Sequence, residues 1–402
     1  MRTTTLACVT CAALLLGCRT LDAPSSIRTV ATIATSGNPE AAVRGIVKGR
    51  ATAYTRDPRV LVADLRAVKR DYERLEAFLT GRVNGSWGRK ETKLPSRTQY
   101  VKYTQNYRSR AVVDFDAGQV TVETVDDKDP RASLKSAIVT TLLTPDDPRA
   151  VDLFSDKPIA LTSSQTPYLL GLVHDASGKS IASPEQAERF ADRLLEKAPA
   201  ERKVESQEGA KVARSVSFPM VANFAGKQAE KYRDVVERFA ERYKISPSLV
   251  YAIIRTESNF NPYAVSSAPA YGMMQLVPSS GGREAFRHAK GRDEMPSREY
   301  LFDPANNIEL GTAYLNVLFE RELDDITNPV SREYCVISAY NTGPSNVLRA
   351  FSRDRVAALN GINSLEPPGV FERLRTNLPY EETRQYLAKV VSYRRQFLTF
   401  GH

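Results

Sequence analysis

The chain has 402 residues, of which 42% are hydrophobic and 26% are charged. This length is enough for two or three domains, and the composition is that of a globular protein rather than of a disordered or fibrous one. The formal net charge of +9 suits an anionic partner, such as a nucleic acid, an anionic lipid or a wall polymer. No basic block with interleaved aromatic residues occurs, so nucleic-acid binding is not favoured.

The first 17 residues are predicted to be a secretory signal. Arg2 gives a positive start, and residues 6–16 form an apolar run too short for a permanent membrane span. The run ends in Leu15-Leu16-Gly17-Cys18, which resembles a bacterial lipobox with Cys18 as the acylated residue. The alternative is an ordinary signal peptide with a chance cysteine. Arg19 is not the Asp of inner-membrane lipoproteins, so the resemblance implies a lipid anchor in the outer membrane, facing the periplasm.

Cysteine and histidine limit the chemistry. Once the signal is removed and Cys18 carries lipid, Cys335 is the only free thiol, so an intramolecular disulfide is excluded. The three histidines have no metal-ligand spacing; they are His174, His288 and His402. We therefore expect no metal and no cofactor, and we expect any chemistry to rest on carboxylates and neutral hydrogen-bonding groups.

An α+β domain is predicted over residues 56–224, after a tether over residues 18–55 that is rich in Ala, Thr, Ser and Arg. Its predicted elements are, in order, a helix from Pro58, a loop over 81–99, a β-hairpin around Asp116-Ala117-Gly118, a helix with Leu134 to Leu142 on one face, a strand over 168–174, a helix over 184–195 and a charged connecting stretch over about 196–212. Nothing in this domain indicates catalysis, so its expected role is structural, by positioning or by substrate contact.

The remaining part, residues 225–402, is predicted to be all-α. Helices are expected at 227–243, from Ser246 to Glu257, at 307–319, at 332–340 and at 381–397, with a Pro- and Gly-marked connection over 363–369. The fold class is therefore α+β, with an amino-terminal α+β domain followed by an all-α domain.

Glu257 is the strongest candidate for a catalytic group. It follows Leu249, Val250, Ile253 and Ile254 at helical spacing, so it continues an apolar face that should be buried. Burial disfavours the charged form and raises the pKa of a carboxyl. An acid still protonated near neutral pH is what protonating a glycosidic oxygen requires. The alternative is a buried Glu satisfied by a backbone N–H or an Arg.

Two other stretches have structural explanations of their own. Tyr340 stands near the end of a helix that Gly343 and Pro344 stop, and it could be a core aromatic. Glu381 and Glu382 lie in a predicted first turn, where acidic residues favour the helix dipole.

Taken together, the motifs resemble the family 1 lytic transglycosylases, which have a lysozyme-like domain. The matching motifs are Glu257-Ser258-Asn259-Phe260-Asn261-Pro262, then Ala264, Ser266 and Ala268, then Gly272-Met273-Met274-Gln275, then Ala339-Tyr340-Asn341-Thr342-Gly343, and finally Glu382-Thr383-Arg384. Met273 and Thr342 depart from the usual Leu and from the usual Ala or Gly. Tyr100-Val101-Lys102-Tyr103-Thr104, the 114–124 hairpin and Asp146-Asp147-Pro148 are similar to the amino-terminal domain of a membrane-bound member of that family.

The resemblance implies non-hydrolytic cleavage of the β-1,4 bond between MurNAc and GlcNAc in peptidoglycan, which leaves 1,6-anhydro-MurNAc ends. Glu257 would act first as acid and then as base. Ser266, Gln275, Tyr340 and Glu382 would line the substrate site, Ser258 would make a helix-end hydrogen bond, and Asn341 would shape a loop. The expected partners are glycan strands, outer-membrane lipid through Cys18 and proteins of the cell-wall machinery.

Two other functions stay open at the level of sequence. A hydrolytic muramidase on the same fold would need a second carboxylate to activate water, for which Glu284, Asp293 or Glu294 could be proposed. A non-enzymatic lipoprotein could instead tether the outer membrane to the wall.

Overall fold

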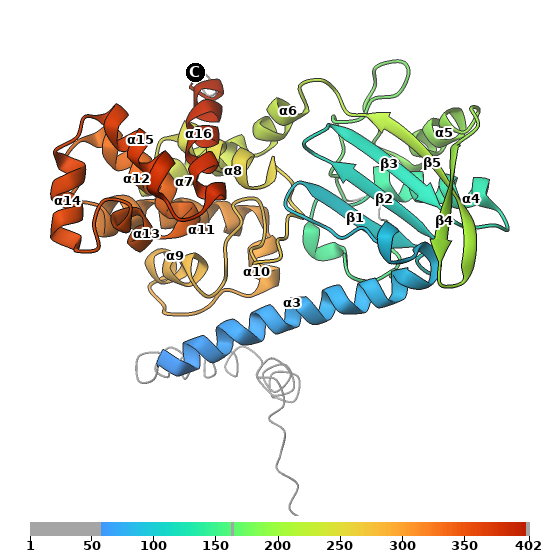
Figure 1. Cartoon of the computed structure of the whole chain (residues 1–402). Coiled ribbons are helices and arrows are strands. Elements are labelled where there is room, and N and C mark those ends of the chain that lie inside the picture. Colours follow the sequence, from blue (N-terminus) through green and yellow to red (C-terminus); the bar gives the residue numbers. More distant parts are fainter. Residues whose placement is uncertain (1–57, 162–164, 399–402) are drawn as a thin grey trace, which may run out of the picture. The chain divides into compact units, whose positions relative to one another are not determined.

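The computed structural model describes residues 58–161 and 165–398, and Figure 1 shows its elements. The predicted signal, the tether and Cys18 lie outside the described residues. The predicted fold class is confirmed, because a region built on a five-stranded sheet is followed by a region of helices. None of the helices in the described part of the chain has both the length and the apolar character that crossing a bilayer needs.

The sheet is antiparallel throughout, with the strand order β1-β2-β3-β5-β4. Its strands are β1 (Gln99–Thr104), β2 (Ser109–Asp114), β3 (Gln119–Thr124), β4 (Ala200–Ser206) and β5 (Gly209–Pro219). The predicted hairpin is confirmed: Asp114 pairs with Gln119, and Gly118 supplies a positive φ of 63° in the turn between them.

Within residues 58–161 and 165–223, the sheet region has three α-helices: α3 (Pro58–Trp87), α4 (Pro130–Leu142) and α5 (Pro184–Leu194). Two short 3₁₀ turns accompany them, Arg89–Glu91 and Pro148–Ala150. The helix α4 packs on β2 and β3, and α5 packs on α4 (Figure 1). Both begin with a side-chain cap, from Asp129 and Ser183 respectively, as these residue types favour.

Three predictions in the sheet region were wrong, and the first two concern the end of a helix and a predicted strand. The helix α3 does not end near residue 80 but continues to Trp87, whose ring is fully buried and whose N–H donates to the Tyr107 carbonyl at 2.6 Å. The predicted strand over 168–174 is a series of turns, with one isolated bridge between His174 and Ser180. Most of its apolar residues are buried although Leu170 is exposed, and the hydrophobic pattern alone does not distinguish such buried turns from a short strand.

The charged stretch over 196–212 is not a linker, which corrects the third prediction. It forms β4 and the start of β5, and these two strands extend the sheet beyond β3. Val204 and Ala213 are buried while the residues beside them are exposed or half-buried, as expected for antiparallel strands with one covered face. Part of the charge of this stretch is paired across strands, as in the ion pair between Glu201 and Arg214 at 2.8 Å.

The helical region contains eleven α-helices among the described residues. They are α6 (Phe224–Lys231), α7 (Arg233–Tyr243), α8 (Pro247–Ser258), α9 (Gly281–Lys290), α10 (Arg298–Phe302), α11 (Pro304–Val317), α12 (Pro329–Thr342), α13 (Pro344–Arg349), α14 (Arg355–Asn363), α15 (Pro367–Asn377) and α16 (Glu381–Gln396). A short π-helical turn, Leu318–Glu322, follows α11.

The helix α8 is the core of this region, since most of its length is buried and it packs against α7 and α16. The predicted helices at 307–319, 332–340 and 381–397 correspond to α11, α12 and α16. The predicted helix at 227–243 is two helices that meet at Tyr232. The connection over 363–369 contains the last residue of α14, a short link over 364–366 and the start of α15.

The loop after α8 joins the helical region to the sheet region. Asn259 and Phe260 take positive φ values of 48° and 63° and turn the chain out of the helix. The Asn261 amide then donates to the Arg97 carbonyl at 3.0 Å. The Tyr263 ring packs against Tyr100 and Tyr168, with centroids 4.9 Å and 5.2 Å apart. The loop is therefore held by β1 and by the turns near residue 168.

Further along, Gly272 permits a close approach of the same loop to α10 and α11. Its φ is +75°, and a Cβ there would lie 2.4 Å from the Leu301 carbonyl oxygen and 2.3 Å from the Asn307 side-chain nitrogen. The side-chain nitrogen of Asn307 donates hydrogen bonds to the carbonyls of Tyr271 and Leu301, and its side-chain oxygen accepts one from the Met274 N–H at 2.7 Å.

Gly272→Ala should therefore destabilise the protein well beyond the cost of a positive φ. Gly178→Ala is the matched control, since Gly178 has a φ of +79° but open space around it. We expect about 1 kcal/mol for the control and at least about 2 kcal/mol more for Gly272→Ala, measured by urea unfolding. Equal losses in the two variants would contradict the steric account.

Candidate active site

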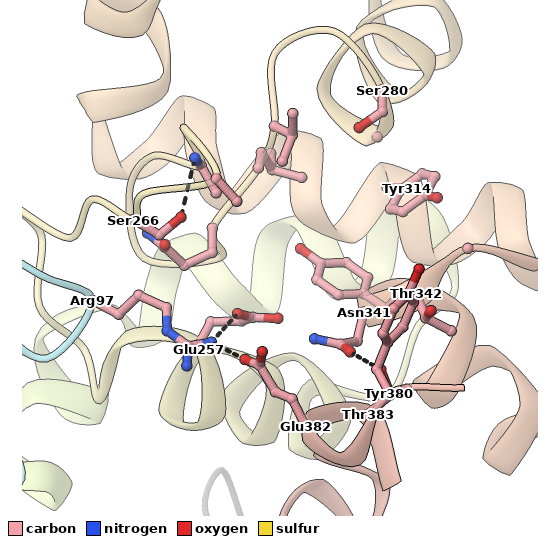
Figure 2. A pocket seen from close by; sticks show the side chains of 18 of the residues that line it. Arg97, Glu257, Ser266, Ser280, Tyr314, Asn341, Thr342, Tyr380, Glu382 and Thr383 are labelled. Carbon is pink, nitrogen blue, oxygen red and sulfur yellow. Dashed lines mark hydrogen bonds and ion pairs between the residues drawn. The ribbon is translucent and has the colours of Figure 1, made fainter. Parts of the chain in front are cut away.

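Glu257 lies in the wall of a cleft of about 620 Å³ (Figure 2). The cleft is lined by the end of α8, the loop before α9, parts of α11, α12 and α13, the start of α16 and the segment before β1. All five residues predicted for the site line it, namely Glu257, Ser266, Gln275, Tyr340 and Glu382.

The Glu257 carboxyl is buried, with only 4% of the residue exposed. Its Oε1 accepts a hydrogen bond from the Tyr386 hydroxyl at 2.8 Å, and its Oε2 lies 3.9 Å from a guanidinium nitrogen of Arg97. Burial raises the pKa of Glu257 to about 7; the Tyr386 hydrogen bond and the Arg97 charge lower it, and the Glu382 charge raises it further. The carboxyl therefore changes its protonation state near neutral pH.

Tyr340 lines the cleft close enough to Glu257 for the two groups to interact electrostatically. Its hydroxyl donates to the Met274 carbonyl at 2.8 Å, and its ring packs against Tyr314 with centroids 5.6 Å apart. Burial and the nearby Glu257 charge raise the pKa of Tyr340 well above its ordinary value. The hydroxyl therefore stays neutral, and its oxygen can still accept a hydrogen bond.

Gln275 leaves one polar atom without a partner. Its side-chain nitrogen donates to the Gly272 carbonyl at 2.9 Å, but its Oε1 is buried and has no hydrogen-bond partner. A buried acceptor without a partner costs free energy unless a ligand or water satisfies it. Ser266, on the same loop, is half-buried, and its hydroxyl accepts from the Ala270 N–H at 3.3 Å.

Glu382 lies in the first turn of α16 with 62% of its side chain exposed. It forms an ion pair with Arg97 at 3.0 Å. Figure 2 shows the Arg97 side chain extending toward both Glu257 and Glu382. The two acidic groups therefore share one cation.

Sequence reasoning missed two residues of this site, Tyr386 and Arg97. A signal existed for Tyr386: it lies four residues after Glu382, on the face of α16 that carries the buried Leu387 and Val390. A buried tyrosine on such a face needs a partner for its hydroxyl. Nothing local marked Arg97, because it lies in a segment without regular structure and its partners are far away in sequence.

The helix-end hydrogen bond expected of Ser258 is confirmed. Asn341 lies in the last turn of α12 and lines the cleft, so its expected role in shaping a loop stays a prediction. The Ser258 hydroxyl lies within hydrogen-bond distance of the Ile254 and Met273 carbonyls, at 3.2 Å and 2.8 Å. The Asn341 amide oxygen accepts from the Thr383 hydroxyl at 2.6 Å, so it ties the end of α12 to α16.

The acids proposed as partners for hydrolysis lie elsewhere. Glu284 and Asp293 line a second cavity of about 300 Å³, where Asp293 pairs with Arg283 at 2.6 Å, and Glu294 lies 3.3 Å from Arg292. Within the described ranges, no group of three or more His, Cys, Asp or Glu side chains could hold a metal.

Comparison with known proteins gives matches to both regions. A family model for the "Membrane-bound lytic murein transglycosylase C, N-terminal domain" matches residues 56–231, and one for the "Transglycosylase SLT domain" matches residues 234–360. The membrane-bound lytic murein transglycosylase C of Klebsiella pneumoniae is 46% identical over 78% of this chain and 87% of its own. That of Yersinia enterocolitica is 44% identical over 81% of this chain and 89% of its own. The solved 70-kDa soluble lytic transglycosylase of Escherichia coli is 26% identical over 42% of this chain and 24% of its own, with a TM-score of 0.32.

The buried Glu257 carboxyl should make stability depend on pH. Its folded pKa of about 7 lies above the ordinary 4.5, so burying the charge costs free energy above pH 7, and this cost disappears as the pH falls toward 4.5. The shift corresponds to about 3 kcal/mol at its full extent. Relative to the parent, Glu257→Gln should therefore gain about 2 kcal/mol more stability at about pH 8 than at about pH 5, measured by urea unfolding. The same difference at both pH values would show that the carboxyl is not held in a desolvated site.

Proposed function

Because the chain belongs to the membrane-bound lytic murein transglycosylase C family, we propose that Glu257 is the single acid–base group of its reaction. The chain is a lytic transglycosylase with an amino-terminal α+β region and a helical, lysozyme-like catalytic region. It acts on peptidoglycan, where it cleaves the MurNAc–GlcNAc β-1,4 bond and leaves 1,6-anhydro-MurNAc ends.

The proposed reaction moves one proton out of Glu257 and one proton back. Protonated Glu257 gives its proton to the glycosidic oxygen as the bond from C1 of MurNAc to that oxygen breaks. The substrate's N-acetyl oxygen stabilises the positive charge at C1. The Glu257 carboxylate then takes the proton of the C6 hydroxyl, whose oxygen bonds to C1 and closes the anhydro ring. No water enters the balance, so one carboxyl performs both proton transfers.

The burial of Glu257 against Tyr386 is the observation that carries this proposal. With a pKa of about 7, the carboxyl is protonated in a large fraction of molecules at neutral pH and can also exist as a carboxylate. The Tyr386 hydroxyl occupies Oε1, so the proton that is transferred belongs on Oε2. Burial raises the pKa of Tyr386 well above its ordinary value, so Tyr386 remains a hydrogen-bond donor throughout.

The other lining residues are proposed to hold the sugars. The buried Oε1 of Gln275 offers an acceptor for a hydroxyl or an N-acetyl N–H of the substrate. Ser266 and Tyr340 add hydroxyl oxygens on two sides of the cleft, and Glu382 adds an exposed carboxylate at its rim. Glu382 is the other carboxylate among the residues that line the cleft, and it is already paired with Arg97.

Glu257→Gln should lower the rate of glycan cleavage by about 10³-fold, because the amide can neither donate nor take up the proton. The measurement is mass spectrometry of the fragments released from purified sacculi, which also shows whether the ends are anhydro or reducing. Glu284→Gln is the matched control: this acid also has a raised pKa through burial, but it lies in the neighbouring cavity, so the rate should stay within about twofold.

Two results would contradict the proposal. Cleavage by Glu257→Gln at the parent rate would show that another group supplies the proton. Reducing ends from the parent enzyme would show that water attacks C1, as in a hydrolytic muramidase.

We further propose that Cys18 carries the lipid that makes this chain membrane-bound, in the outer membrane and facing the periplasm. The proposal is supported by the lipobox-like Leu15-Leu16-Gly17-Cys18 and by Arg19 in place of the retention signal Asp. The proposed division is then a signal over 1–17, a tether over 18–55, an α+β domain over 56–224 and a catalytic domain over 225–402. The matched ranges 56–231 and 234–360 support this division.

Labelling with radioactive palmitate, followed by membrane fractionation, tests the anchor. Cys18→Ser should lose the label and leave the membrane fraction, while Cys335→Ala, which removes a buried thiol, should keep both. Arg19→Asp should keep the label and move the protein to the inner membrane. A labelled Cys18→Ser variant would disprove the assignment of the lipidated residue.

A further inference from the structure

We propose that Arg97 is a positioning residue of this reaction: held by Glu382, it sets the charge balance at the Glu257 carboxyl from outside the helical region. The inference rests on the proposed role of Glu257. It gives the α+β region a direct part in the chemistry, since Arg97 lies two residues before β1.

The backbone around Arg97 is fixed by the loop that follows α8. The Arg97 carbonyl accepts the Asn261 side-chain amide at 3.0 Å, and the Ser96 carbonyl accepts the Val265 N–H at 3.4 Å. On the other side, the Gln99 N–H donates to the Ser96 hydroxyl at 3.2 Å. These bonds use no atom of the Arg97 side chain, so the guanidinium can be changed without removing them.

The Arg97 side chain lies between two carboxyl groups. Its guanidinium is 3.0 Å from Glu382 Oε1 and 3.9 Å from Glu257 Oε2, so the ion pair with Glu382 is direct and the approach to Glu257 is looser. The side chain is 39% exposed and also borders a neighbouring cavity of about 540 Å³, which Ser266 lines as well. Its position is therefore set mainly by Glu382.

Four titratable groups face Glu257 from the elements packed around it. Arg97 comes from the segment before β1, Glu382 and Tyr386 come from α16, and Tyr340 comes from α12. The two tyrosines stay neutral because burial raises the pKa of each well above its ordinary value. Arg97 and Glu382 are the charged members, and their effects on Glu257 have opposite signs.

The reaction needs such a balance because Glu257 must be an acid first and a base second. After the first proton transfer, a buried carboxylate remains, and Arg97 is the only cation among the described residues that line the cleft. Arg97 therefore stabilises the charged intermediate state. Before the reaction, the negative charge of Glu382 offsets the positive charge of Arg97, so Glu257 does not lose its proton too early.

The pH dependence of the rate separates this role from a purely structural one. In the full-length enzyme, Arg97→Gln should move the alkaline limb of the pH–rate profile to higher pH by about 0.5 unit. Glu382→Gln should move the same limb to lower pH by about as much. Each shift changes the protonated fraction of Glu257 about threefold on that limb. Arg97→Lys keeps the charge and should keep the limb near its parent position. The double variant Arg97→Gln/Glu382→Gln should return close to the parent profile. The readout is the initial rate of anhydro-product release from sacculi.

A matched control removes an ion pair of similar length from the same region. Arg214→Gln breaks the contact with Glu201 on β4 and β5, far along the sheet from the cleft, and should leave the limb unchanged. If the alkaline limb stays at the parent pH in both Arg97→Gln and Glu382→Gln, the proposed role of Arg97 is wrong, even if the rates of these variants fall. An active Glu257→Gln enzyme would instead overturn the proposed function itself, so the two failures are distinguishable.

Discussion

The arrangement of the cleft depends on the free-energy cost of keeping the Glu257 carboxyl out of water. Glu257 continues the buried face of α8, and burial is the main cause that raises its pKa to about 7, against the Tyr386 hydrogen bond and the Arg97 charge. Each pKa unit of such a shift corresponds to about 1.4 kcal/mol of differential stability between the two protonation states. The packing of α8 against α16 is what maintains this cost, because the same contact that brings Tyr386 to Glu257 also excludes solvent from it.

The sheet region takes part in this arrangement rather than standing apart from it. Through the Tyr263 ring and the Asn261 amide, the loop after α8 is held against β1 and the segment before it. The Asn259 amide adds a bond to the Phe115 carbonyl in the β-hairpin. One wall of the cleft is therefore supported by elements more than a hundred residues earlier in the chain, and Arg97 lies where the two regions meet.

Patterns local in sequence were enough to predict the burial of Glu257, the helices that carry it and the hairpin at Gly118. They failed where distant partners decide the structure. The charges of 196–212 are typical of a solvent-exposed linker, and only the pairing of β5 with the distant β3 makes this stretch part of a sheet. The turns near Tyr168 are buried because the rings of Tyr100 in β1 and of Tyr263 pack on them. Arg97 could not be found at all, since its only distinguishing property is its distance to two acids that lie 160 and 285 residues further along.

The geometry of the shared cation explains how a single acid can serve two opposite steps under the proposed mechanism. A buried carboxyl without any cation nearby would hold its proton too tightly to release it, whereas a direct, bidentate arginine would keep it ionised at neutral pH. Arg97 avoids both extremes, because its direct ion pair is with the exposed Glu382 and it stands 3.9 Å from Glu257. The strength of the counter-charge is thus set by a residue that solvent and substrate can reach. A glycan in the cleft that displaces water from Glu382 would change the charge balance at Glu257 when the proton has to move.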